Sequence, residues 1–190
     1  MLRSHLISGT IALAILVLSA TPLVASDSSR RTAPTTTFVD GTFGFRVKKD
    51  ESRYWNFVPP KKEGPLRLTL DHTIGGKKDF IRFQVYAWET KKLGGTEAMH
   101  LERWKGEVQK LFGEIAEQKT RDKARFGRYK TRSFTAYGKL ATDETQIRRL
   151  TCHVFKYKSH MYTVILMHEP GMDKKYKKEI QALQKYFRAA

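Results

Sequence analysis

The stretch MYTVILMHEPGMDKKYKKEIQALQKYF, residues 161–187, decides the fold class. Its first seven residues are almost continuously apolar, which is typical of a strand covered on both faces. Pro170 and Gly171 end this strand, and Asp173 can cap the helix that follows. The apolar residues of that helix recur at helical spacing, at Tyr176, Ile180, Leu183 and Phe187. A buried strand followed by an amphipathic helix predicts a mixed α and β domain.

Strand patterns occupy much of the chain before this stretch. Leu66, Leu68 and Leu70 alternate with polar residues, which is typical of a half-buried strand. Segments 80–88, 129–140, 146–157 and 161–168 also have strand character, and the last two are expected to form a hairpin around Lys158 and Ser159. Two shorter strands, 43–47 and 54–58, flank a charged turn. Trp55, beside this turn, is the aromatic residue most expected to be exposed.

One amphipathic helix interrupts the strands. Gly94 and Gly95 break the preceding pattern, and Thr96 can cap a helix whose first turn contains Glu97. Its expected apolar face consists of Ala98, Leu101, Trp104, Val108, Leu111, Phe112 and Ile115. The predicted fold class is therefore α+β, with an antiparallel β-sheet sandwiched by helices.

Two stretches resemble the PsbP-like fold family. GTFGFRVKKDESRYWNF, residues 41–57, is similar to the family's first hairpin, in which a Gly-Phe strand leads to a turn and a Trp. Residues 161–187 are similar to its last strand, loop and closing helix. The proline often found before the hairpin Trp is absent here, and the usual Ser-Phe at the end is Tyr186-Phe187. The resemblance implies an α/β/α sandwich and a binding or accessory role more than catalysis, since the family has no shared catalytic residue.

The first 26 residues have the order of a secretory signal peptide. Arg3 precedes the uncharged apolar segment 6–20, and Pro22 and small residues lead to expected cleavage after Ser26 or Ala25. An uncleaved N-terminal anchor is the alternative. Segment 27–37, DSSRRTAPTTT, is expected to be a flexible tether, and 38–190 a single folded domain. No later segment is apolar enough to cross a membrane. The expected location is the periplasm or the medium, at a bacterial envelope.

The charge is the strongest anomaly of composition. Lys and Arg total 36 against 19 Asp and Glu, which gives a net charge of +17 at pH 7. A field of this sign favours polyanionic partners. Export argues against nucleic acid, so an anionic envelope component or an acidic protein is the expected partner. A solubilising surface of a basic protein is the alternative.

Motifs for chemistry are missing from the sequence. There is no phosphate loop, no Gly-x-Ser-x-Gly elbow and no His-Glu-x-x-His spacing. His153 and His160 could approach each other across the last hairpin, but two ligands without a third make a weak zinc site. Cys152, the single cysteine, is expected to be a buried, inert thiol. We therefore expect no catalytic residue, metal or cofactor.

Two basic segments are the candidate sites. The last helix carries cations away from its apolar face, several of them in first turns where the helix dipole disfavours them. Segment 121–132 carries two alternating trios, each of which would lie on one side of an extended chain. The candidate residues are Lys174, Lys177, Lys178, Lys185 and Arg188 in the first set, and Arg121, Lys123, Arg125, Arg128, Lys130 and Arg132 in the second.

The pattern as a whole predicts an exported, non-enzymatic binding or accessory module that presents a basic face. An enzyme whose active site is scattered through the sequence is one alternative, and a structural protein of the cell envelope is another.

Overall fold

The computed structural model describes residues 37–48, 55–58, 60, 64–72 and 80–190. The predicted signal peptide, and all of the predicted tether except Thr37, lie outside the described residues. The described strands form two antiparallel sheets. The smaller has the order β1-β2-β10, with β1 (Thr37–Asp40), β2 (Phe45–Lys48) and β10 (Phe187–Ala189).

The larger sheet has the order β3-β4-β5-β9-β8-β7-β6. Its strands are β3 (Trp55–Val58), β4 (Leu66–His72), β5 (Ile81–Glu89), β6 (Phe112–Phe126), β7 (Tyr129–Leu140), β8 (Asp143–Tyr157) and β9 (His160–His168). The described helices are α1 (Thr90–Leu93), α2 (Glu97–Leu111), α3 (Met172–Lys175) and α4 (Lys177–Tyr186). No described helix has the length and apolar character needed to span a membrane.

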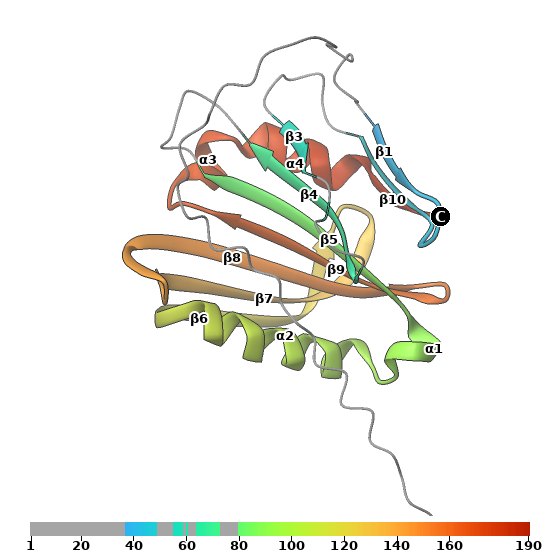
Figure 1. Ribbon diagram of the computed structural model, residues 1–190, viewed down its shortest axis with the longest axis horizontal. Helices are drawn as coiled ribbons and strands as arrows, with labels where there is room; N and C mark the ends of the chain where they lie inside the picture. The colour runs from blue at the N-terminus through green and yellow to red at the C-terminus, as the bar shows by residue number, and fades with distance from the viewer. Residues whose placement is uncertain (1–36, 49–54, 59, 61–63, 73–79) are drawn as a thin grey trace, which may run out of the picture.

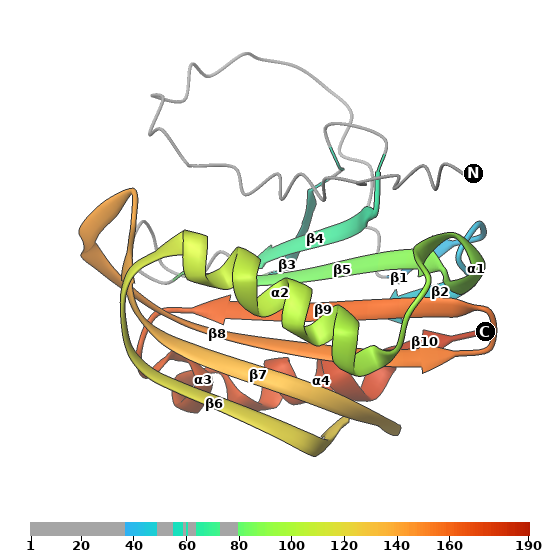
Figure 2. The ribbon, with the colours of Figure 1, turned by 90° about the horizontal axis from the view of Figure 1, so that it is seen from below.

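The two faces of the larger sheet are covered differently. α2 crosses one face, over β7 and β8, as Figures 1 and 2 show. On the other face α4 shares the covering layer with the three-stranded sheet (Figure 1). The α+β class and the antiparallel sheet are thus confirmed. The expected sandwich by helices is only partly matched, because the helices are few and strands supply part of one layer.

Side chains that alternate along the central strands form two hydrophobic cores. On β5, Phe83 and Val85 belong to the core beneath α4, whereas Tyr86 belongs to the core beneath α2. β9 lies between β5 and β8, and this central position accounts for its almost continuous apolar run. The expected hairpin between β8 and β9 is confirmed, with Lys158 at a positive φ of 52° in its turn.

α2 begins as predicted and ends earlier than predicted. The Thr96 hydroxyl accepts a hydrogen bond from the Met99 backbone N–H at 3.3 Å. The helix ends at Leu111, whose carbonyl accepts from Ala141 N–H at 2.9 Å. Phe112 and Ile115 therefore lie in β6, because pairing with β7 takes over from the helix at this point.

β6 itself was not predicted as a strand. It is an edge strand with most of its residues exposed, so it lacks the apolar alternation that identifies a half-buried strand. Its pairing with β7 is interrupted by three shifts of register, and its exposed residues are largely charged. Bulges and charges are devices that protect a sheet edge from pairing with other chains.

The prediction that segments 43–47 and 54–58 form a first hairpin is wrong. β2 pairs with β1 and β10, whereas β3 pairs with β4 in the other sheet. The intervening charged segment lies partly outside the described residues. The expectation that Trp55 is exposed is also wrong, since its side chain is 0% exposed and packs edge-on against His72, with ring centroids 4.7 Å apart.

The C-terminal helix is shorter than predicted and is preceded by a separate turn. Gly171, with φ of 84°, is the N-cap of α3, so Asp173 lies inside its first turn and does not cap it. Tyr176 separates the two helices, as the C-cap of α3 and the N-cap of α4. Phe187 lies in β10, where pairing with Val47 of β2 replaces the helix. The predicted apolar residues are nevertheless buried together in one core.

The burial predicted for Cys152 is confirmed, because its side chain is 0% exposed in the core beneath α2. Burial raises the pKa of the thiol. A buried thiol with a raised pKa is a poor nucleophile, which agrees with a packing role.

Candidate functional site

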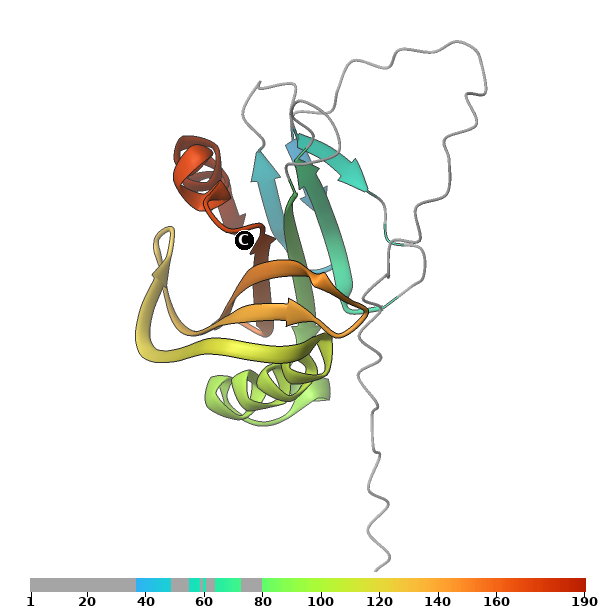
Figure 3. The same cartoon turned by 90° about the vertical axis from the view of Figure 1, so that its left-hand side faces the viewer.

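The turn between β6 and β7 is anchored to the C-terminal end of the chain. Phe126 and Tyr129, on either side of the turn, pack against Phe187 with ring centroids 5.6 and 5.8 Å away. The Ala189 backbone N–H donates a hydrogen bond to the Tyr129 hydroxyl at 2.7 Å. These contacts hold the turn (yellow) beside α4 (red), as Figure 3 shows.

Gly127 lies at the point of closest approach between the turn and α4. Its φ is +55°, in the left-handed region that favours glycine. A Cβ atom at this position would lie 2.3 Å from the carbonyl oxygen of Gln184. The backbone of the turn therefore packs directly on the backbone of the helix, and only glycine fits there.

Between the turn and α4 is a cleft of about 500 Å³. Its lining comes from the hairpin on one side and from the last two turns of α4 and β10 on the other. The lining residues are Arg125, Gly127, Arg128, Gln181, Gln184, Lys185 and Arg188. This lining contains four cationic side chains, two amides and no carboxylate.

The four cations of the cleft are not neutralised by ion pairs. Within the part of the chain that the structure describes, none of them lies within salt-bridge distance of a carboxylate. By contrast, the cations Arg67, Arg82 and Arg132 are each paired with an aspartate. Other described cations, such as Lys123 and Lys130, also have no ion pair, so the cleft is distinguished by the meeting of four unpaired cations in one place.

Two of the four cations have a structural role as well. The Arg188 guanidinium donates hydrogen bonds to the carbonyls of Phe187, at 2.8 Å, and of Lys185. Arg188 and Lys185 lie at the C-terminal end of α4, where cations interact favourably with the helix dipole. Arg125 and Arg128 lie on the hairpin, away from the helix end, and the Arg128 guanidinium lies over the Tyr129 ring, 6.0 Å from its centroid.

The structure joins part of the first predicted basic set to part of the second. Lys185 and Arg188, from the helix set, meet Arg125 and Arg128, from the strand set. Lys177 and Lys178 are exposed one turn of α4 before Gln181 and extend the positive face toward its other end. Lys174 is exposed in α3. These three lysines do not line the cleft.

The expected one-sided trios of segment 121–132 are not formed. Arg121 lies opposite Ser133 and Arg125 lies opposite Lys130, and the shift of register between Arg121 and Ala124 therefore puts the two arginines on opposite faces. In the second trio Arg128 belongs to the turn, and Arg132 of β7 is paired with Asp122. Lys123 and Lys130 are exposed and lie outside the lining of the cleft.

The histidines do not form the weak zinc site considered from the sequence. His153 contacts the hydroxyl of Thr131 through Nδ1 at 3.0 Å, whereas His160 packs on Phe43 with ring centroids 5.5 Å apart. Among the described residues, no group of three or more His, Cys, Asp or Glu side chains could hold a metal ion.

Two histidines with lowered pKa values make the stability of the fold depend on pH. Burial lowers the pKa of His153 to about 4, and burial followed by the charge of Arg103 lowers the pKa of His100 to about 4. At a pH between the unfolded pKa of 6.5 and the folded pKa of about 4, these histidines bind protons in the unfolded chain and not in the folded protein. The free energy of unfolding should therefore fall as pH decreases below 6.5, by up to about 1.4 kcal/mol per pH unit for each histidine.

Urea unfolding across this pH range measures the slope. Replacing His153 with Gln removes one titrating group and should make the slope shallower. A slope that the substitution does not change would contradict the assignment of this pH dependence to His153.

Gly127, Gln181 and Gln184 were not predicted from the sequence. The available signal was Gly127 itself, which with Arg128 separates Phe126 from Tyr129, two residues of paired strands. The two glutamines gave no signal, because nothing in the sequence indicated which face of α4 meets the hairpin.

Comparison with known proteins concerns the fold. No protein-family model matches the chain, and no curated protein matches its sequence. Among solved structures, a protein from Bacteroides thetaiotaomicron VPI-5482 is 9% identical, with a TM-score of 0.52 over 83% of this chain. The chain spans about half of that protein, 49% of its length.

Two further structures cover most of both chains. LpqN, described as involved in cell envelope biogenesis of Mycobacterium tuberculosis, is 11% identical, with a TM-score of 0.51 over 80% of this chain and 88% of its own. Cyanobacterial PsbP (CyanoP) from Synechocystis sp. PCC 6803 is 15% identical, with a TM-score of 0.48 over 88% of this chain and 99% of its own. A PsbP is among the solved structures that the chain is similar to, and at these identities each likeness is one of fold alone.

Proposed function

We propose that the protein is an exported accessory module, without catalysis of its own, that binds an anionic partner through the cleft between α4 and the β6–β7 turn. The observation that carries this proposal is the meeting of four unpaired cations from two separate parts of the sequence. Like charges brought together at a surface repel, so this arrangement stabilises the fold less than a mixed surface would. A bound anion would remove that repulsion.

Export fits the same proposal. A signal peptide directs the chain to the envelope, where anionic lipids, glycans and protein faces are available. LpqN, which has a similar fold, is described as involved in cell envelope biogenesis. We therefore expect the partner to be a component of the envelope or an acidic protein located there.

Binding to lipid vesicles across a salt series tests the proposal. The protein is expected to bind vesicles that contain phosphatidylglycerol in preference to phosphatidylcholine vesicles. It should be released as salt approaches about 1 M, where the Debye length is about 3 Å. Release by salt also separates this proposal from that of a structural envelope protein, which should remain associated at high salt.

A triple variant, Arg125→Gln/Arg128→Gln/Lys185→Gln, locates the binding site. It should weaken vesicle binding more than Lys174→Gln/Lys177→Gln/Lys178→Gln, which removes the same charge at the other end of the C-terminal helical region. Equal losses in the two variants would mean that net charge alone, and not the cleft, determines binding. Turnover of a substrate that the triple variant abolishes would instead favour an enzyme.

A further inference from the structure

We infer that the ligand of the cleft is a compact polyanion that carries at least two phosphate groups close together. This inference rests on the proposed function and specifies the chemistry that the same site recognises.

The charges of the cleft are divided between two walls. Arg125 and Arg128 of the hairpin form one wall, and Lys185 and Arg188 at the end of α4 form the other. Three of the four cations are arginines, whose planar guanidinium groups donate paired hydrogen bonds that match the oxygens of a phosphate. Two walls of this kind can each hold one phosphate group.

The amount of charge favours more than one phosphate. Three arginines and one lysine line the cleft, which sums to +4. A single phosphate monoester carries about −1.5 to −2 at pH 7, so it would neutralise no more than about half of that charge. The charge of two or three linked phosphates matches the charge of the cleft.

The size and polarity of the cleft favour a small hydrophilic ligand. Its volume of about 500 Å³ falls within the roughly 300–1,000 Å³ that is typical of small-molecule sites. Apart from the four cations and Gly127, its lining consists of the amides of Gln181 and Gln184, which can both donate and accept hydrogen bonds. The exposed large hydrophobic residues of the described chain, Val39, Val58, Met99 and Ile147, do not line it, so no large apolar side chain is available there to an acyl chain.

The walls are held in place before any ligand binds. The contact of Gly127 with Gln184 fixes the distance between turn and helix, and the hydrogen bond from Ala189 to Tyr129 ties β10 to the hairpin. Arg188 is further oriented by the carbonyl that it contacts at 2.8 Å. The backbone of the site is thus formed before binding, whereas the exposed side chains of Arg125, Arg128 and Lys185 are ordered by the ligand.

Titration calorimetry with inorganic triphosphate and inorganic phosphate tests the inference. Triphosphate is expected to bind at least about tenfold more tightly than phosphate, because it can accept at least one additional charge-assisted hydrogen bond. The variant Arg125→Gln/Arg128→Gln/Lys185→Gln should lose at least about tenfold in triphosphate affinity. The control Lys174→Gln/Lys177→Gln/Lys178→Gln should lose clearly less affinity, because its charges act on the ligand only through the screened field beside the cleft.

Other outcomes overturn the inference, the proposed function or both. Equal affinity for triphosphate and phosphate, or an equal loss in the two variants, would overturn the inference. Binding of phosphatidylglycerol vesicles or oligoglutamate that depends on the cleft, without binding of triphosphate, would overturn it while leaving the proposed function in place. If none of these probes binds, both fail.

Discussion

Replacing Gly127 with alanine is expected to separate the β6–β7 turn from α4 and to reduce anion binding by about tenfold or more. The new Cβ would lie 2.3 Å from the Gln184 carbonyl oxygen, so one of the two backbones must move. Alanine also disfavours the observed φ of +55° by roughly 1–2 kcal/mol. We expect a loss of about 1–3 kcal/mol in the free energy of unfolding, with the fold retained.

Urea unfolding and triphosphate titration measure these two effects. Gly106→Ala is the matched control, since Gly106 lies in the middle of α2 and a Cβ there would meet no atom within 4 Å. That control should leave binding unchanged and should raise stability by up to about 1 kcal/mol, because alanine favours the helix. Unchanged binding in Gly127→Ala would contradict the view that this contact shapes the cleft.

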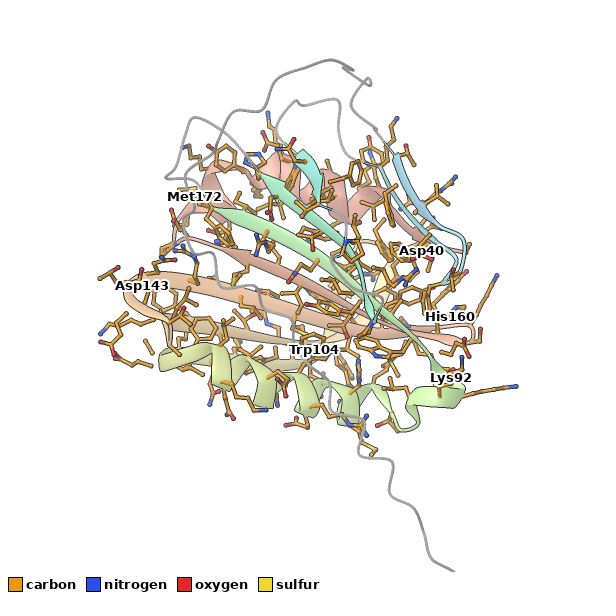
Figure 4. All side chains as sticks on the ribbon, in the orientation of Figure 1. Asp40, Lys92, Trp104, Asp143, His160 and Met172 are labelled. Atoms are coloured by element: carbon orange, nitrogen blue, oxygen red, sulfur yellow. The ribbon has the colours of Figure 1, made fainter. Side chains whose placement is uncertain are left out.

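Replacing Trp104 with alanine is expected to produce the largest loss of stability, about 3–5 kcal/mol. The Trp104 side chain is 1% exposed, beneath α2 (Figure 4), and its ring centroid lies 4.7 Å from that of Tyr86. Its indole N–H also donates to His100 Nε2 at 3.3 Å. Alanine removes the packing and this hydrogen bond together.

The same substitution should leave the cleft intact in the fraction of protein that remains folded. Trp104 belongs to the core beneath α2, on the face of the sheet opposite to α4. Met99→Ala, at a position that is 53% exposed, serves as the control and should change stability by less than about 0.5 kcal/mol. A Trp104→Ala protein as stable as this control would contradict the described core.

The sequence predicted most of the central sheet because its strands alternate or are continuously apolar. β7 is predicted at its observed bounds, and β5, β8 and β9 to within a few residues. These strands pack on one or both faces, so burial leaves a periodic pattern in the chain. β6 leaves no such pattern, since both of its faces are largely exposed.

Pairing between distant segments explains the other errors. A strand was predicted at 43–47 and β2 is found at Phe45–Lys48, but its partners are β1 and the last strand of the chain. Phe187 continues the apolar pattern of α4 and yet belongs to β10. Local patterns identify elements, whereas the choice of partner depends on contacts between residues far apart in sequence.

The candidate site was predicted in its chemistry and not in its geometry. Arg125, Arg128, Lys185 and Arg188 were all identified as candidate anion-binding residues. Their convergence depends on the packing of Phe126 and Tyr129 against Phe187, which brings the hairpin to the end of α4. The lysines at positions 174, 177 and 178 looked equivalent in the sequence and lie outside the cleft.

Binding of one ligand between the two walls can be followed by the amide chemical shifts of isotope-labelled protein during a titration with triphosphate. We expect the signals of Gly127, Arg128, Gln184 and Lys185 to shift together along one saturating curve, while those of Lys174 and Lys178 shift little. These residues are far apart in sequence and meet only at the cleft. Shifts centred on residues 174–178, or shifts of one wall without the other, would mean that the anion does not bind between the hairpin and α4.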